Sequence, residues 1–207
     1  MQIKKEAKVN LAVKTLSIVI MLAGFIVILG WIFDVSAIKN VMSNASGMSL
    51  ATAIAFVFTG VIVYYLNEHQ KGNIFTASVI IPFFTSMILI LLLYFLLLDF
   101  TGLHPVVDRL FIGHNEEILH IPSPLTVLNF LLISLAAMIC IFNKPRYKRL
   151  FKTMGIVIVL TGLTAVLGYI FNQPIMYYLI EGNGGMAVHT ASLFIITGIS
   201  LFLLSKY

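Results

Sequence analysis

Six long runs of apolar residues, each almost free of charge, dominate this chain. A helix of about twenty such residues crosses a hydrocarbon layer roughly 30 Å thick. We expect the runs to be helical because backbone polar groups in lipid must find hydrogen-bond partners within their own segment. We therefore predict an all-α integral membrane protein with six transmembrane helices, at Thr15–Phe33, Ser49–Leu66, Ala77–Leu98, Leu125–Phe142, Thr153–Phe171 and Met186–Leu204.

The composition agrees with a lipid environment. Of 207 residues, 60% are hydrophobic and 10% are charged, whereas soluble globular domains carry about 25% charged residues. We expect a single membrane domain over residues 1–207, without a soluble domain of its own. The first run is too long for a signal peptide and lacks its cleavage pattern, so we expect it to remain as a span. The single cysteine, Cys140, excludes an internal disulfide framework and a Cys-rich metal site.

The positions of the basic residues predict the orientation. Short loops rich in Lys and Arg are held in the cytoplasm during membrane insertion. Of the 13 Lys and Arg residues, only Lys39 and Arg109 lie outside the two terminal segments and the loops after the second and fourth runs. We therefore expect a multi-pass protein of the cell's inner membrane with both termini in the cytoplasm. Because the net charge of +5 is distributed in this way, it indicates no nucleic-acid partner.

The three predicted outer loops are short and amphipathic, with apolar residues at helical intervals. Such segments are typical of short helices that lie in the headgroup region of a membrane. Plain hydrophobic hairpin connections are the alternative interpretation. The residues that carry the pattern are Val35, Ile38, Val41 and Met42, then Val106, Val107, Leu110 and Phe111, and finally Ile175, Tyr178 and Leu179.

The second outer loop gathers imidazole and carboxylate groups, a combination that suits zinc, copper or iron. The candidate metal ligands are His104, Asp108, His114, Glu116, Glu117 and His120, with His189 approaching from the last run. A metal bound to this loop is the one cofactor that the sequence suggests. A wet loop at headgroup level also collects polar residues without binding a metal, and a pH response through the histidines is a further hypothesis.

Two sequence motifs recur at one fixed interval. Residues 29–34, Leu-Gly-Trp-Ile-Phe-Asp, reappear as Leu-Gly-Tyr-Ile-Phe-Asn at 167–172. Residues 47–53, Gly-Met-Ser-Leu-Ala-Thr-Ala, reappear as Gly-Met-Ala-Val-His-Thr-Ala at 185–191. The interval from the first copy to the second is identical for both motifs, without a gap. Ungapped repetition of this kind indicates an internal repeat.

A weaker middle copy begins at Ser123-Pro124-Leu125-Thr126 and continues to Phe130, with Ser134 where the other copies have glycine. We therefore predict three helical hairpins, at about residues 10–68, 72–143 and 148–207. Each starts on the same side of the membrane, so the repeat is parallel, unlike the inverted repeats of many transporters.

The repeated residues predict a helix-packing motif. Thr, Phe and Gly at i, i+4 and i+8 share one helix face, and glycine allows close approach of a neighbouring backbone. A ligand groove lined by the same residues is the alternative. The motif comprises Thr52, Phe56, Gly60, Thr126, Phe130, Thr190, Phe194 and Gly198, and the repeated aromatic anchors at the predicted outer edge are Trp31, Phe33, Tyr169 and Phe171.

Catalysis, transport and channel function have little support in the residues. Ionisable groups inside spans usually mark function, and His189 is the clearest candidate. A single histidine there is more typical of a hydrogen bond between helices than of a ligand. We see no nucleophile with a matching base, so we predict no enzyme. The expected partners are the lipid bilayer and another membrane protein or an output domain, and a homo-oligomer is compatible with this pattern.

A Gly-aromatic-Ile-Phe motif, an amphipathic segment and then Met-x-x-x-Thr-Ala-x-x-Phe run through nearly all of the chain. This pattern resembles the N-terminal membrane-sensor region of prokaryotic sensor histidine kinases and diguanylate cyclases. Residues 186–191 match the Met-Ala-x-His-Thr-Ala signature of that region. Residues 48–53 match its Met-Ser-Pro-Asn-Thr-Ala signature, with Leu50 and Ala51 in place of Pro and Asn.

The resemblance implies a non-catalytic sensor or input module of a signalling system. In such proteins the last span leads into PAS, kinase or cyclase domains, whereas this sequence has no phospho-acceptor helix, ATP-binding glycine box or cyclase motif. Either the chain is the input region of a larger receptor, or it is a free-standing relative that acts on another membrane protein. The alternative to a sensor is an accessory or structural subunit of a larger membrane complex.

Overall fold

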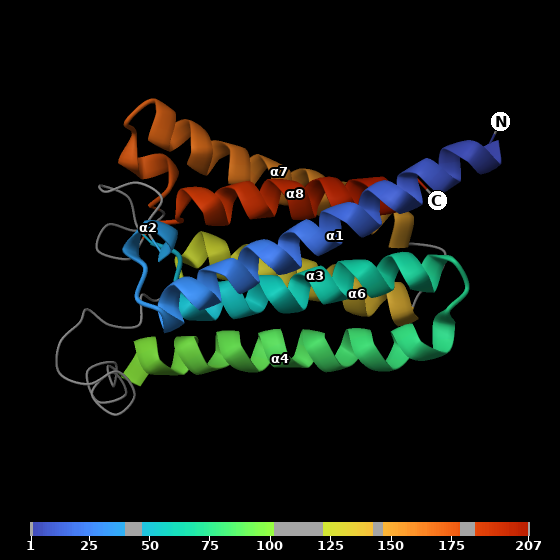
Figure 1. Ribbon diagram of the computed structural model, residues 1–207, viewed down its shortest axis with the longest axis horizontal. Helices are drawn as coiled ribbons and strands as arrows, with labels where there is room; N and C mark the ends of the chain where they lie inside the picture. Colours follow the sequence, from blue (N-terminus) through green and yellow to red (C-terminus); the bar gives the residue numbers. More distant parts are fainter. Residues whose placement is uncertain (1, 40–46, 102–121, 143–146, 179–184, 207) are drawn as a thin grey trace.

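The computed structural model describes residues 2–39, 47–101, 122–142, 147–178 and 185–206. Within these ranges every regular element is a helix (Figure 1). The elements are α1 (Gln2–Ile32), α2 (Ser36–Lys39), α3 (Leu50–Gln70), α4 (Ile74–Thr101), α6 (Pro124–Phe142), α7 (Tyr147–Ile170), the 3-10 helix η1 (Pro174–Met176) and α8 (Val188–Leu204).

Five of the described helices, α1, α3, α4, α6 and α7, are long and apolar enough to cross a membrane. Helix α8 is apolar as well but has 17 residues. The prediction of an all-helical, membrane-embedded protein is therefore confirmed. Helix α1 begins at Gln2 rather than Thr15, and α7 begins at Tyr147 rather than Thr153. These basic N-terminal turns continue the helix beyond its apolar stretch.

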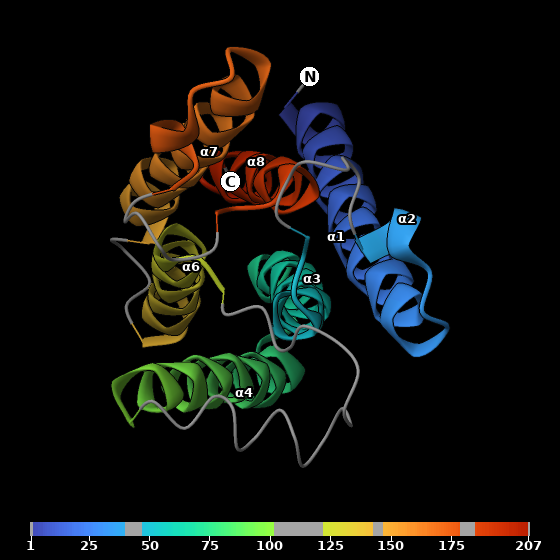
Figure 2. The ribbon, with the colours of Figure 1, turned by 90° about the vertical axis from the view of Figure 1, so that its left-hand side faces the viewer.

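The long helices form an inner group and an outer group. Figure 2 looks along the bundle and shows α3 and α8 near its centre, with α6 beside them between α4 and α7, and α1, α4 and α7 around this group. Burial agrees with this picture. In the most apolar stretch, 61% of the residues of α3 and 50% of those of α6 are buried, against 28% in each of α1, α4 and α7. The outer helices therefore present most of their apolar side chains to the surroundings.

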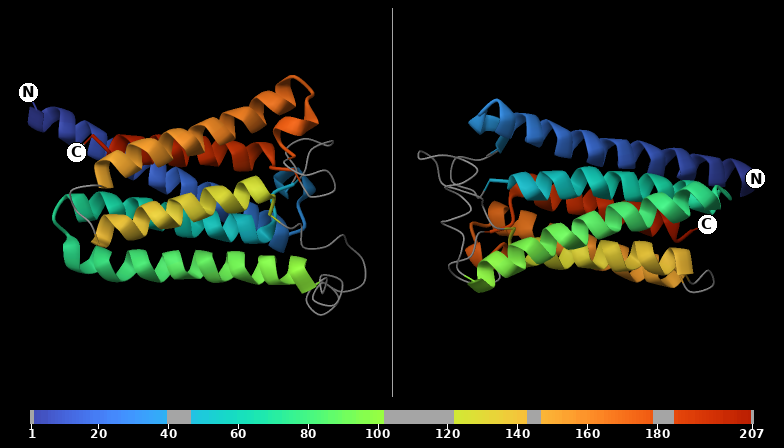
Figure 3. Two further views of the ribbon diagram at one scale, coloured as in Figure 1. Left: turned by 180° about the vertical axis from the view of Figure 1, so that it is seen from behind. Right: turned by 90° about the horizontal axis from the view of Figure 1, so that it is seen from below.

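Each outer helix packs against two inner helices: α1 against α3 and α8, α4 against α3 and α6, and α7 against α8 and α6. The most extensive packing is within the pairs α1–α3 and α7–α8, whereas α4 packs more extensively against α3 than against α6. Figure 3 shows the same arrangement from behind and from below. Both chain termini lie at one end of the bundle, which we call the terminal end, and α2 and η1 lie at the opposite, distal end (Figure 1).

Helices α1 and α7 end in the same way at the distal end. Asp34 and Asn172 adopt the left-handed conformation, with φ of 53° and 52°. The next backbone N–H then donates to a carbonyl oxygen five residues back, from Val35 to Gly30 and from Gln173 to Gly168, at 2.8 Å in each case. This is the Schellman arrangement, which asparagine tolerates better than most residues and which satisfies the last helical carbonyls.

Two of the inner helices begin with the same side-chain cap. The hydroxyl of Ser49 accepts a hydrogen bond from the backbone N–H of Thr52, at 3.1 Å, and Ser123 accepts from Thr126 at 3.3 Å. Such caps satisfy one of the free N–H groups of a first helical turn. Ala187 stands at this position before α8 and has no side-chain acceptor.

The structure describes parts of two of the loops in which we predicted interfacial helices, and each contains one short helix. Helix α2 covers four residues, and η1 covers three. In η1, Ile175 is 82% exposed. The other predicted residues, Val41, Met42, Val106, Val107, Leu110, Phe111 and Leu179, lie outside the described residues.

Candidate functional site

Three phenylalanines meet at the centre of the bundle. Phe56 of α3, Phe130 of α6 and Phe194 of α8 are each at most 1% exposed. Their ring centroids are 4.9 to 5.0 Å apart in all three pairs, with tilted or edge-to-face geometry. Aromatic pairs favour this spacing and tilt. The motif phenylalanines therefore join the three inner helices to one another, in addition to any role within a hairpin.

Glycines bring α1 close to α3. A Cβ on Gly60 would lie 2.8 Å from the backbone oxygen of Ser17, and one on Gly24 would lie 2.7 Å from that of Ala53. Contacts this short leave no room for a side chain. Close backbone approach through small residues is how helices associate in a membrane, where burial of apolar surface gives little driving force.

The same contacts recur between α7 and α8. A Cβ on Gly198 would lie 2.6 Å from the backbone oxygen of Gly155, and one on Gly162 would lie 2.7 Å from that of Ala191. The interval between the two copies of each sequence motif also separates the residues of these contacts. Gly198 and Gly155 correspond in this way to Gly60 and Ser17, and Gly162 and Ala191 correspond to Gly24 and Ala53.

The middle pair, α4 and α6, differs from the other two at the glycine position. Ser134 of α6 stands where α3 and α8 have glycine. Helix α4 also packs less extensively against α6 than α1 packs against α3 or α7 against α8. It packs instead on α3, where the rings of Phe58 and Phe84 lie 5.3 Å apart.

At the distal end, a hydrogen bond joins α1 to the segment before α3. The indole Nε1 of Trp31 donates a hydrogen bond to the backbone oxygen of Met48, at 3.0 Å. The Lys39 ammonium lies 4.9 Å from the centroid of the Trp31 ring and pairs with Asp34. Gly30 makes room for α2, because a Cβ there would lie 2.6 Å from Ile38 Cγ2.

A corresponding hydrogen bond joins α7 to the segment before α8. The hydroxyl of Tyr169 donates to the backbone oxygen of Met186, at 2.9 Å. The Tyr169 ring also stacks on Tyr177, with centroids 4.0 Å apart. We call these two hydrogen bonds from aromatic side chains, Trp31 to Met48 and Tyr169 to Met186, the distal clamps. The other two predicted anchors, Phe33 and Phe171, are 71% and 64% exposed at the same end.

At the terminal end, the last turns of α3 contact three other helices. Asn67 donates to the side-chain oxygen of Asn10 in α1, at 2.9 Å. Nδ1 of His69 lies 4.0 Å from the Cys140 sulfur in α6. Gln70 donates to the backbone oxygen of Leu204 at the end of α8, at 3.2 Å.

A side-chain hydrogen bond also joins α7 to α6. The hydroxyl of Thr161 in α7 donates to Oδ1 of Asn129 in α6, at 2.9 Å. Asn129 is fully buried. The hydrogen bond connects α6 to α7, and the presence of Asn129 in the sequence did not specify this contact.

Of the candidate metal ligands, the structure describes His189 only. It is the second residue of α8 and is half-buried, and within the described residues neither of its ring nitrogens has a hydrogen-bond partner. His104, Asp108, His114, Glu116, Glu117 and His120 lie outside the described residues. In the described ranges, no three His, Cys, Asp or Glu residues come together as a metal-binding group. The metal hypothesis therefore stays a prediction.

The remaining motif residues are buried at the starts of the inner helices. Thr52, Thr126 and Thr190 are 2% to 4% exposed. The hydroxyls of the first two lie 2.8 Å from the capping serines Ser49 and Ser123. These two threonines therefore lie beside the capping hydroxyls at the helix starts, and the ligand-groove alternative stays a prediction.

These features define an all-helical, membrane-embedded protein with a tightly packed core. No known protein family, curated protein or solved structure matches this chain in comparisons of its sequence and its fold.

Proposed function

We propose that this chain is a non-catalytic sensor or input module of a signalling system, with three parallel hairpins, six spans and both termini in the cytoplasm. The observation that carries this proposal is the way α8 is held at three levels. Its start is held by the Tyr169 clamp, its middle by the phenylalanine cluster, and its end by Gln70.

The three levels make α8 a mechanical connection between the two ends of the bundle. A helix of 17 residues is about 25 Å long. In this proposal a displacement at the start of α8, next to Met186, is carried along the helix to Leu204. Packed helices respond to such displacements by small shifts between discrete arrangements, which is how receptors carry a signal across a membrane. In this proposal the stimulus acts at the distal end or within the bilayer, and α8 delivers the response.

Charge and helix length support the proposed topology. The terminal end carries Lys8, Lys14, Lys152 and Lys206, and basic residues favour the cytoplasmic side. Helix α8, with its 17 residues, is at the lower limit for a span. Met186 and Ala187 precede α8 and are buried, so the apolar segment is longer than the helix itself.

A distance measurement between two spin labels tests the sensor proposal. The labels would be placed at Lys71→Cys and Ser205→Cys in a Cys140→Ser background, at the terminal ends of α3 and α8. We expect Tyr169→Phe, which breaks the clamp at the other end of α8, to shift the distance distribution. Tyr94→Phe on the surface of α4 is the matched control. An unchanged distribution in Tyr169→Phe would argue for a passive scaffold.

The alternative is an accessory subunit of a larger membrane complex. The observation that favours it is the apolar surface of the outer helices, where Leu22, Phe83 and Leu160 are each more than half exposed. Intact-mass measurement of the native product in a mild-detergent extract separates the two. A covalent mass well above 23.0 kDa indicates a receptor, whereas an unchanged covalent mass with a stoichiometric second polypeptide indicates a subunit.

A further inference from the structure

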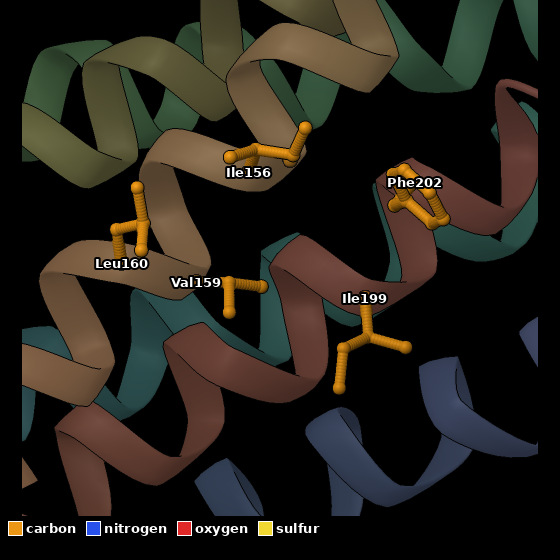
Figure 4. Close-up of a pocket in the computed structure, with 6 residues that line it drawn as sticks. Ile156, Val159, Leu160, Ile199 and Phe202 are labelled. Carbon is orange, nitrogen blue, oxygen red and sulfur yellow. The ribbon is translucent and has the colours of Figure 1, made fainter.

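An apolar groove of about 220 Å³ runs along the surface between α7 and α8. Its walls are Gly155, Ile156, Val159, Leu160, Ile199 and Phe202. In Figure 4, Val159 lies between the two helices, with Ile156 and Leu160 on α7 and Ile199 and Phe202 on α8. Ile156, Leu160 and Ile199 are 41% to 54% exposed. The groove therefore opens outward, toward the region that lipid occupies.

Two small residues create this groove. Gly155 has no side chain, and Val159 is short. At the corresponding positions of the α1–α3 pair, the chain has Ser17 and Met21. The Met21 side chain lies against Gly60 as the Val159 side chain lies against Gly198. Because Val159 lines the groove, the longer side chain of a methionine at this position would extend into it.

Basic side chains gather where the groove approaches the terminal end. Lys152 precedes Ile156 by four residues and Arg149 precedes it by seven, so all three lie on one face of α7. Both basic residues are exposed. Just after the end of α8, the Lys206 ammonium lies 4.9 Å from the ring centroid of Phe202, which lines the groove. Neither α7 nor α8 contains an Asp or Glu.

We propose that this groove binds one anionic phospholipid, with an acyl chain between α7 and α8 and the phosphate among Arg149, Lys152 and Lys206. From Lys152 to Leu160 the helix rises about 12 Å, close to half of a hydrocarbon layer of about 30 Å. The groove and the basic residues beside it together therefore span nearly the depth of one leaflet. Basic pockets between helices on the cytoplasmic side are a known mode of lipid headgroup recognition.

Charge distinguishes this occupant from a second copy of the chain. A symmetric dimer through the groove would bring two basic clusters together without a carboxylate from α7 or α8 to compensate them, which is unfavourable. A phospholipid supplies both the apolar chain and the negative charge. The proposal goes beyond the sensor function, and it does not depend on it.

Native mass spectrometry of the delipidated protein tests the proposal, with phosphatidylglycerol and phosphatidylcholine of identical acyl chains as probes. We expect the anionic lipid to bind at least tenfold more tightly. Lys152→Gln and Lys206→Gln should each weaken its binding about fivefold, the factor expected for one basic side chain at a membrane surface. Lys71→Gln, in the turn between α3 and α4, is the matched charge control and should leave binding unchanged.

Val159→Met tests the groove separately from the charges. It should weaken binding of both lipids, since the acyl chain loses its space. Equal binding of the two lipids would overturn the proposal. So would a Lys71→Gln effect equal to that of Lys152→Gln, because surface charge would then account for the binding. An unaltered lipid affinity in Val159→Met would show that the lipid binds elsewhere. A co-purifying polypeptide that is lost in this variant, and that phosphatidylglycerol does not displace from the wild type, would show that the groove binds a protein and not a lipid.

Discussion

The indole of Trp31 donates a hydrogen bond to the backbone oxygen of Met48 over 3.0 Å. At the equivalent positions of the later motif copies, a tyrosine hydroxyl makes the corresponding contact, from Tyr169 to Met186, over 2.9 Å. Tryptophan and tyrosine differ in size and shape, but each carries one polar group at the edge of an aromatic ring. The shared feature is thus the hydrogen bond that joins an outer helix to the start of an inner helix.

Removing either distal clamp should destabilise the protein modestly. Trp31→Phe and Tyr169→Phe each leave a buried or half-buried carbonyl oxygen without its donor, and we expect each to lower the free energy of unfolding by about 1 kcal/mol. Thermal unfolding in detergent, followed by circular dichroism, measures the effect. Tyr94→Phe, on the exposed surface of α4, should leave the midpoint unchanged. Equal thermal midpoints for all three variants and the wild type would show that the distal clamps do not stabilise the protein.

The glycine contacts predict a larger effect. In Gly60→Ala and Gly198→Ala, the new methyl group would lie 2.8 Å and 2.6 Å from a backbone oxygen of the facing helix. The helices must separate, and we expect a loss of about 1–3 kcal/mol for each. The larger Gly60→Leu and Gly198→Leu should loosen the pairs further. Thermal midpoints of all four variants in detergent measure this.

Ser134 in α6, at the position where α3 and α8 have glycine, is the control for the glycine variants. Ser134→Ala should cost much less than either glycine variant, because α6 already carries a side chain there and α4 packs mainly on α3. If Ser134→Ala and Gly198→Ala lowered the midpoint equally, close approach of helix backbones would not be the cause.

The phenylalanine cluster should behave as one cooperative unit. Phe56→Ala and Phe194→Ala each leave a cavity among three helices, with an expected loss of about 3–5 kcal/mol. Because the two rings touch, the double variant should lose less than the sum of the single losses. Steric-trap or chemical unfolding in detergent gives these free energies. Phe75→Ala, whose ring is 86% exposed, is the control, and strict additivity of Phe56 and Phe194 would contradict a shared cluster.

The sequence indicated the helices well because lipid imposes a simple rule. Apolar runs of sufficient length are helical, and a described helix covers most of each of the six predicted runs. Helix ends were less accurate because basic turns continue a helix past its apolar run, as at Gln2 and Tyr147. The three-hairpin repeat and the orientation remain predictions, although the contacts of Gly60 and Gly198 are closely alike.

The site was predicted only in part. Periodicity assigned Phe56 to a packing face, but it could not show which helix that face meets, and the ring lies against Phe130 and Phe194. The hydrogen bond from Gln70 to Leu204 joins residues far apart in the sequence, and no local pattern specifies such a contact. The groove was missed for a similar reason. It depends on Val159 being shorter than Met21, a difference that has meaning only once the two helix pairs are compared in space.

The orientation can be tested by cysteine labelling from one side of the membrane. In a Cys140→Ser background, single cysteines at Lys71 and Ser205 lie at the terminal end, and one at Ile175 lies at the distal end. Since basic loops are retained in the cytoplasm, we expect a membrane-impermeant maleimide added to intact cells to label Ile175→Cys alone. Permeabilised cells should label all three, which controls for reactivity. Labelling of Lys71→Cys and Ser205→Cys in intact cells would reverse the orientation, and labelling of Ser205→Cys together with Ile175→Cys would show that α8 does not cross the membrane.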